Sequence, residues 1–81
     1  MIVDNKEIFA RLNEVFRDVF DRADISVEAS TVAADIKGWD SLQHITLMQA
    51  VEDEFDVKFS MREIVSLQNV GDIAAIIAKK N

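Results

Sequence analysis

The segment GWDSLQHI, residues 38–45, holds the side chains of this sequence that are best suited to chemistry. Ser41 carries a hydroxyl, and His44, the only histidine of the chain, follows three residues later. A hydrolytic serine needs a base, a group that orients the base, and donors for the oxyanion. Ser41 and His44 become neighbours on a helix, but the segment lacks the G-x-S-x-G pattern of a nucleophile elbow and implies no oxyanion hole. We therefore predict no catalytic residue and no enzyme.

Metal chemistry has little support in the same residues. The sequence has no second histidine and no cysteine that could join His44, and protein sites for transition metals need several such ligands. The acidic run EDEFD lacks the D-x-[DN]-x-[DN]-G spacing of a calcium-binding loop. We predict no metal site, while weak binding of divalent cations by the acidic run stays open.

Ser41 lies where a helix is expected to begin. Asp40 can cap the helix, and Gln43 three residues later completes the pattern of a helix start. The first turn offers unpaired N–H groups and the positive end of the helix dipole, which stabilises a phosphate by roughly 0.3–1 kcal/mol. Leu42 and Ile45 fall outside the apolar face of this helix, so two aliphatic side chains surround the hydroxyl. The pattern predicts that Ser41 tolerates a phosphoester and lies in a contact surface.

Four helices must position this segment, and each starts with a small polar residue followed three residues later by an acidic or amide residue. These pairs are Asp4 with Glu7, Asp40 with Gln43, Ser60 with Glu63, and Asn69 with Asp72. Two of the starts add apolar pairs suited to a hydrophobic staple, Val3 with Ile8 and Phe59 with Ile64. Apolar residues at helical spacing predict helices over residues 5–21, 41–55, 61–66 and 70–79.

Residues 22–39 form an unusually long connection between the first two helices. Ile25, Val32 and Ile36 are expected to pack this connection against the core. No segment shows convincing strand alternation, proline is absent and glycine occurs only twice. The sequence therefore predicts an all-α fold: a small four-helix bundle with a long loop between the first and second helices and a short third helix, in one domain over residues 1–81.

Charge narrows the classes of partner. The net charge is −6, and residues 38–57 contain no lysine or arginine. The acidic residues of that stretch are Asp40, Glu52, Asp53, Glu54 and Asp56. Such a stretch is either a solvated helix face or a docking surface for partners with basic patches, with Glu52 and Asp53 as candidate contacts. The charge disfavours nucleic acid and anionic membrane surfaces as partners.

Several absences in the sequence bear on location. It contains no cysteine, no secretory-signal pattern and no apolar run near the ~18 residues that a membrane span needs. Disulfides and thiolate ligands are therefore excluded, and an untargeted cytoplasmic protein without a membrane segment is the expectation.

The segment GWDSLQHITLMQAVEDEFDVKFS resembles the central part of acyl carrier proteins. Asp40-Ser41-Leu42 matches the family motif Asp-Ser-Leu at the start of the second helix. The acidic and aromatic end typical of that helix is matched by Glu52-Asp53-Glu54-Phe55. The resemblance covers nearly the whole chain, with the expected helix order, long first loop and short third helix.

The resemblance implies a function for Ser41. In this family the motif serine receives a 4′-phosphopantetheine arm from coenzyme A, transferred by a separate magnesium-dependent phosphopantetheinyl transferase. The thiol of the arm carries acyl groups as thioesters between acyl-transferring and acyl-modifying enzymes with basic docking patches. The resemblance also implies that Asp40 helps the transferase to engage the site and that Leu42 and Ile45 contact partners. A monomer is expected.

Three positions depart from the carriers of fatty acid synthesis. Those carriers usually have acidic residues at the positions of Gln43 and Thr46 and an aliphatic residue at the position of Gln49. A tryptophan before the motif, here Trp39, is more usual in carriers of polyketide or nonribosomal peptide pathways. The resemblance therefore favours a specialised polyketide- or lipid-type pathway over housekeeping fatty acid synthesis. The alternatives are a peptidyl or aminoacyl carrier, or a helical interaction module without a prosthetic group.

Overall fold

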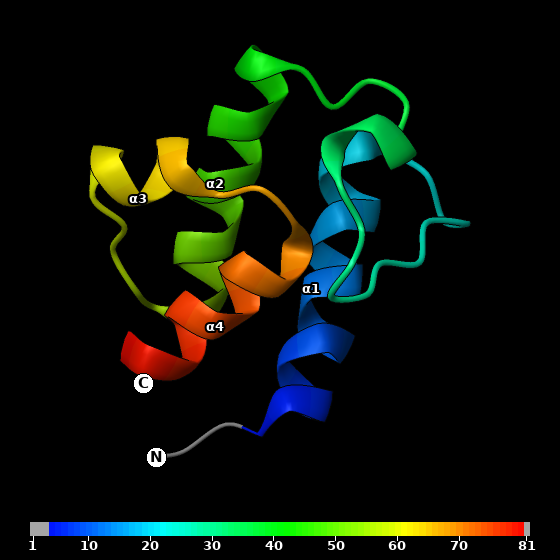
Figure 1. Ribbon diagram of the computed structural model, residues 1–81. Helices are drawn as coiled ribbons and strands as arrows, with labels where there is room; N and C mark the ends of the chain where they lie inside the picture. Colours follow the sequence, from blue (N-terminus) through cyan, green and yellow to red (C-terminus); the bar gives the residue numbers. More distant parts are fainter. Residues whose placement is uncertain (1–3, 81) are drawn as a thin grey trace.

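The computed structural model describes residues 4–80 and contains four α-helices joined by loops (Figure 1). In chain order they are α1 (Asn5–Phe20), α2 (Ser41–Phe55), α3 (Met61–Ser66) and α4 (Val70–Lys80). A 3₁₀ turn, η1 (Ala33–Asp35), lies inside the long loop between α1 and α2. No strand occurs in the described part of the chain, and the predicted all-α fold with a short third helix is confirmed.

The helices begin at the predicted polar residues because each of those side chains accepts a hydrogen bond from an N–H group of the first turn. The pairs and their distances are Asp4 with Glu7 (2.8 Å), Asp40 with Gln43 (2.9 Å), Ser60 with Glu63 (3.1 Å) and Asn69 with Asp72 (2.9 Å). α1 ends one residue earlier than predicted, because Asp21 adopts a left-handed conformation with φ 52°. α4 ends one residue later, at Lys80. Val3, which the sequence pairs with Ile8 in a staple, lies outside the described residues.

The core lies where α1 packs against α2 and α4. Its fully buried side chains recur at helical spacing along these helices, among them Ile8, Leu12, Phe16, Leu47, Val51, Val70, Ile73 and Ile77. α3 contributes no buried side chain, and Figure 1 shows it on the side of α2 away from α1. The core therefore holds α3 less firmly than it holds the other three helices.

The long loop packs against the core through Ile25 and Ile36, as predicted, but the prediction for Val32 is wrong. Val32 is exposed, whereas Val27 and Thr31 are buried. Val32 directly precedes the 3₁₀ turn η1, which changes the direction of the chain at this point. The buried positions in this part of the loop therefore fall before the turn, at Val27 and Thr31, and directly after it, at Ile36.

The loop also caps α4. The Val70 N–H group donates to the Thr31 carbonyl and the Gly71 N–H group to the Ala29 carbonyl, both at 2.9 Å. The first amides of a helix have no acceptor within it, so these loop carbonyls supply the missing partners. Gly71 suits this close approach, because a Cβ atom at that position would lie 2.9 Å from the Ala29 carbonyl oxygen. The loop is thereby fixed to the start of α4.

Candidate functional site

Ser41 is the first residue of α2, and its side chain is exposed. The capping role is filled by Asp40, whose Oδ1 accepts the Gln43 N–H group at 2.9 Å. Within residues 4–80 the Ser41 hydroxyl makes no hydrogen bond, and neither do the N–H groups of Ser41 and Leu42. The start of α2 therefore offers a free hydroxyl beside two free backbone donors.

The chain reaches Ser41 through a tight turn. Gly38 has φ 93°, a left-handed value that side chains other than glycine rarely adopt. Trp39 follows and packs its ring edge-on against Phe16 of α1, with centroids 5.3 Å apart, and obliquely against Phe20 at 6.3 Å. The residue two positions before Ser41 is thus anchored to α1, and the hydroxyl is presented from a fixed turn.

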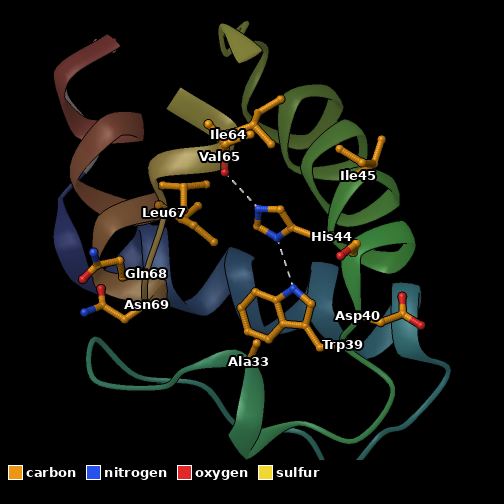
Figure 2. A pocket seen from close by; sticks show the side chains of 12 residues that line it. Ala33, Trp39, Asp40, His44, Ile45, Ile64, Val65, Leu67, Gln68 and Asn69 are labelled. Atoms are coloured by element: carbon orange, nitrogen blue, oxygen red, sulfur yellow. Dashed lines mark hydrogen bonds between the residues drawn. The ribbon is translucent and has the colours of Figure 1, made fainter. Parts of the chain in front are cut away.

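A pocket of about 580 Å³ lies beside Ser41, between α2, α3 and the segment that joins α3 to α4 (Figure 2). Apolar walls come from Ile45 of α2, from Ile64 and Val65 of α3, and from Leu67 and Ile73. The sequence did not predict this pocket. It forms because α3 stands away from the core and leaves space between itself and the first turns of α2.

His44 lies in the wall of this pocket, between Trp39 and Ile64 (Figure 2). The Trp39 indole Nε1–H group donates to His44 Nδ1 at 3.1 Å, and His44 Nε2 lies 3.1 Å from the Ile64 carbonyl oxygen. Both ring nitrogens are occupied by these contacts, and neither bonds the Ser41 hydroxyl. The arrangement is therefore not a nucleophile with its base. The contact of His44 with α3 was not predicted.

Exposed apolar side chains lie on α2 and α3, and two of them, Ile45 and Val65, line the pocket. Leu42 and Ile45 of α2 are 78% and 39% exposed, in agreement with their predicted position beside Ser41. Met61 and Val65 of α3 are 65% and 72% exposed, and helical spacing did not single them out. Their signal in the sequence was only that two large apolar residues stand four apart on a very short helix. The structure extends the apolar contact surface from α2 onto α3.

The candidate acidic contacts lie at the other end of α2 from Ser41. Asp53 is exposed, and its carboxylate forms no hydrogen bond or ion pair with the described residues. Glu52 is half-buried, and its Oε2 accepts the Phe59 N–H group at 2.7 Å. Glu54 is held by Arg11 of α1, with Nε and Oε2 2.9 Å apart. Of the two acidic residues singled out for docking, Asp53 is thus the one with an unengaged carboxylate.

Polar contacts at its start hold α3 beside the pocket. Ser60 and Glu63 form a capping box, and Lys80 Nζ of α4 lies 3.4 Å from Glu63 Oε1. The hydrogen bond from the Ser60 N–H group lowers the pKa of Glu63, and the Lys80 ammonium lowers it further. Glu63 therefore stays ionised at neutral pH and keeps both contacts.

Two further findings concern metals and membranes. Across residues 4–80, no group of three or more histidine, cysteine, aspartate or glutamate side chains is placed to hold a metal ion. No helix in that range is long and apolar enough to cross a membrane.

Comparison with known proteins adds independent findings. Residues 10–77 match the family model described as a phosphopantetheine attachment site. The acyl carrier protein of Akkermansia muciniphila is 38% identical over 60 residues, which are 68% of this chain and 75% of that protein. The acyl carrier protein of Clostridium acetobutylicum is 31% identical over 72 residues, which are 86% of this chain and 91% of that protein.

A solved structure gives the corresponding likeness in three dimensions. The solution structure of a holo acyl carrier protein from Geobacter metallireducens matches with a TM-score of 0.84 at 40% sequence identity. The match covers 90% of this chain and 84% of that chain. At this identity, the likeness concerns sequence as well as fold.

Proposed function

The chain belongs to the phosphopantetheine-binding acyl carrier protein family, and from that premise we propose that Ser41 is the residue that carries the arm. The cofactor is 4′-phosphopantetheine, and members of the family are carriers rather than enzymes. They interact with a phosphopantetheinyl transferase and with acyl-processing enzymes. The observation that carries the proposal is the exposed, unbonded hydroxyl of Ser41 at the capped start of α2.

The residues present suit a phosphoester at this position. The free N–H groups of Ser41 and Leu42 can donate to phosphate oxygens, and the positive end of the α2 dipole favours the negative charge. The arm supplies a thiol on which acyl groups are carried as thioesters. Asp40 keeps the first turn of α2 in place, and we propose that the transferase also recognises this residue.

The attachment site can be tested by intact mass. Incubation with coenzyme A, magnesium and a broad-specificity phosphopantetheinyl transferase should add one phosphopantetheine to the protein. Ser41→Ala should add none, and the matched control Ser30→Ala, at an exposed serine of the loop, should add one. Labelling of Ser41→Ala would overturn the assignment of Ser41. A wild-type chain that stays unmodified with several transferases would instead favour an interaction module without a prosthetic group.

Docking is proposed to combine an apolar and an acidic contact. Leu42 and Ile45 supply exposed aliphatic surface beside Ser41, and Asp53 with Glu52 supplies negative charge for partners with basic patches. The association rate with the transferase should fall as salt is added, because exposed charges are screened over ~8–10 Å near physiological ionic strength. Asp53→Asn should weaken this salt dependence more than Glu52→Gln, since Glu52 also serves the fold. A rate that is indifferent to salt would contradict electrostatic docking.

We further propose a specialised polyketide- or lipid-type pathway. The support is that Gln43, Thr46 and Gln49 bear no charge, while Gln43 is turned toward α1, with Nε2 3.4 Å from the Val19 carbonyl. The loaded protein should therefore be a poor substrate for a fatty-acid ketosynthase. Each missing exposed charge pair is worth only ~0.2–1 kcal/mol, but two of them change affinity several-fold.

The pathway proposal has a direct assay. The triple variant Gln43→Asp, Thr46→Glu, Gln49→Met should recover part of the elongation activity. Wild-type elongation equal to that of a housekeeping carrier in the same assay would refute the specialised pathway. The carrier role would be unaffected.

We also propose that residues 1–81 form one acyl carrier domain that acts as a monomer in the cytoplasm. The support for a single domain is that α1, α2 and α4 share one core, onto which the long loop is packed. Light scattering during size-exclusion chromatography should give the mass of one chain, 9.1 kDa before modification. A stable dimer would contradict the monomer.

A further inference from the structure

His44 connects two segments on opposite sides of the pocket (Figure 2). One is the turn that leads to Ser41, through Trp39, and the other is α3, through the carbonyl group of Ile64. An indole N–H can only donate a hydrogen bond, so His44 Nδ1 must accept. A carbonyl oxygen can only accept, so His44 Nε2 must carry the proton. Both contacts exist together only for the neutral imidazole with its hydrogen on Nε2.

We propose that His44 is a positioning residue, a neutral clasp that holds the Trp39 turn to α3 across the pocket beside Ser41, and that protonation opens it. The imidazolium has a donor on each nitrogen. Its Nδ1–H would face the Trp39 indole N–H, whose nitrogen lies only 3.1 Å away. Protonation of the ring therefore replaces an attraction by a repulsion.

α3 depends on this clasp because little else fastens it. It has no fully buried side chain, although its partly buried Ile64 packs against the core. Its other polar tether is the ion pair of Glu63 with Lys80, which is partly exposed and 3.4 Å long. Opening the clasp should therefore loosen α3 and widen the pocket, while the core formed by α1, α2 and α4 stays intact.

The charged groups around His44 are engaged in other contacts, so protonation of His44 itself is the change that opens the clasp. Asp40 is the one other charged residue among those that line the pocket in the described chain. Its carboxylate already accepts the Gln43 N–H group. On α3, Glu63 is turned to Lys80, and on α4, Asp72 accepts the Gln68 N–H group at 2.9 Å. The remaining walls, from α2, α3, the following segment and the turn, are uncharged.

Nuclear magnetic resonance can test the clasp on the unmodified chain, so the result does not depend on whether Ser41 carries a group. His44 and Trp39 are each unique in the sequence, which makes their ring signals unambiguous. At pH 7.5 the imidazole nitrogen shifts should show the Nε2–H form. As the pH is lowered, the Trp39 indole signal should move with the same midpoint as the His44 ring signals. The Nδ1–H form at pH 7.5, or an indole signal that ignores the titration, would overturn the proposal.

Variants separate a clasp from a merely structural side chain. His44→Phe keeps a ring beside Trp39 but forms neither hydrogen bond. It should abolish the pH-dependent shift of the Trp39 indole signal. It should also speed amide exchange in α3 relative to α4 several-fold at pH 7.5. His44→Gln can donate to Ile64 without titrating, and should restore protection of α3 but not its pH dependence. The control Lys80→Ala removes the other tether and should leave the indole titration unchanged. Exchange in α3 that is unaffected by His44→Phe would show that α3 does not rely on the clasp.

Discussion

The two ends of α2 meet very different surroundings. At the C-terminal end, Phe55 is buried, and Arg11 of α1 lies 4.6 Å from the centre of its ring while binding Glu54. At the N-terminal end, Ser41 and Leu42 are exposed, and the pocket separates the helix from α3. One end is fastened to the core and the other is open to partners.

This difference shows how one helix can serve both stability and presentation. The buried residues of α2 all lie in its later turns, at Leu47, Met48, Val51 and Phe55. Its first turn contributes none, so chemistry and docking there do not draw on the core. A helix is stiff along its length, so the anchored later turns, together with Trp39 packed on α1, hold the first turn in place.

Truncating one leucine at each end should give the largest contrast. Leu47→Ala removes a fully buried side chain and should lower the free energy of unfolding by about 2–5 kcal/mol. Leu42→Ala removes an exposed one and should change it by no more than about 0.5 kcal/mol. Urea unfolding followed by circular dichroism measures both. Equal losses would mean that the first turn belongs to the core after all.

The two flanking aspartates of α2 should respond in opposite directions. Asp40→Ala removes the N-cap and should cost about 0.5–2 kcal/mol of stability. Asp56→Gly should raise stability by about 0.5–1 kcal/mol, because it relieves a left-handed residue at φ 54° and removes a negative charge from the negative end of the helix dipole. Thermal unfolding of both variants checks this. If Asp56→Gly were less stable than the wild type, the Asp56 carboxylate would have to make a stabilising contact at the C-terminal end of α2.

The ion pair between Arg11 and Glu54, at the C-terminal end of α2, should have a smaller effect on stability. Arg11→Ala should cost about 0.5–1 kcal/mol, because its pair with Glu54 is about a third exposed. Added salt should reduce this cost, since it screens the pair. The matched control Arg22→Ala removes an exposed pair with Asp24 in the loop and should be near neutral. If both variants behaved alike at low salt, the contact of α1 with the acidic end of α2 would be unimportant.

The smallest effect on stability is expected from Glu63 of α3, at acidic pH. Folding lowers the pKa of the Glu63 carboxyl below its ordinary value of 4.5. The ionised carboxylate therefore stabilises the fold above pH 4.5. This contribution is lost as the pH falls below 4.5 and through the folded value. Protection of the α3 amides, taken relative to their intrinsic exchange rates, should therefore fall below pH 4.5, and Glu63→Gln should flatten that response. Glu14→Gln, on exposed α1 surface, is the control. His44→Phe should leave this response in place, so the two can be distinguished.

Much of the fold could be predicted because its signals are local. A cap such as Asp40 and the Gln43 N–H group that it binds lie within four residues of each other. The buried face of α2 follows from the spacing of Leu47, Val51 and Phe55. The same spacing placed Leu42 and Ser41 outside the core. Local patterns of this kind state which way a side chain points and where a helix begins.

What the sequence could not supply is which surfaces meet. Arg11 and Glu54 are 43 positions apart, and His44 and Ile64 are 20 apart. No local sequence pattern therefore predicts either contact. The pocket depends on the distance between α2 and α3, which no spacing encodes. Val32 was misplaced for a related reason, because a single 3₁₀ turn changed the direction of the loop.

The hydrogen bonds from Val70 and Gly71 to the loop carbonyls of Thr31 and Ala29 bear on how the chain folds. They join residues about 40 positions apart, so the start of α4 receives its partners only after a long loop has closed. Closure of that loop and completion of α4 are therefore expected to occur in one kinetic step, after α1 and α2 have met. Contacts of such wide sequence separation slow folding in small helical domains. The speed at which this carrier becomes usable after synthesis is then limited by closure of the loop between α1 and α2 onto the start of α4.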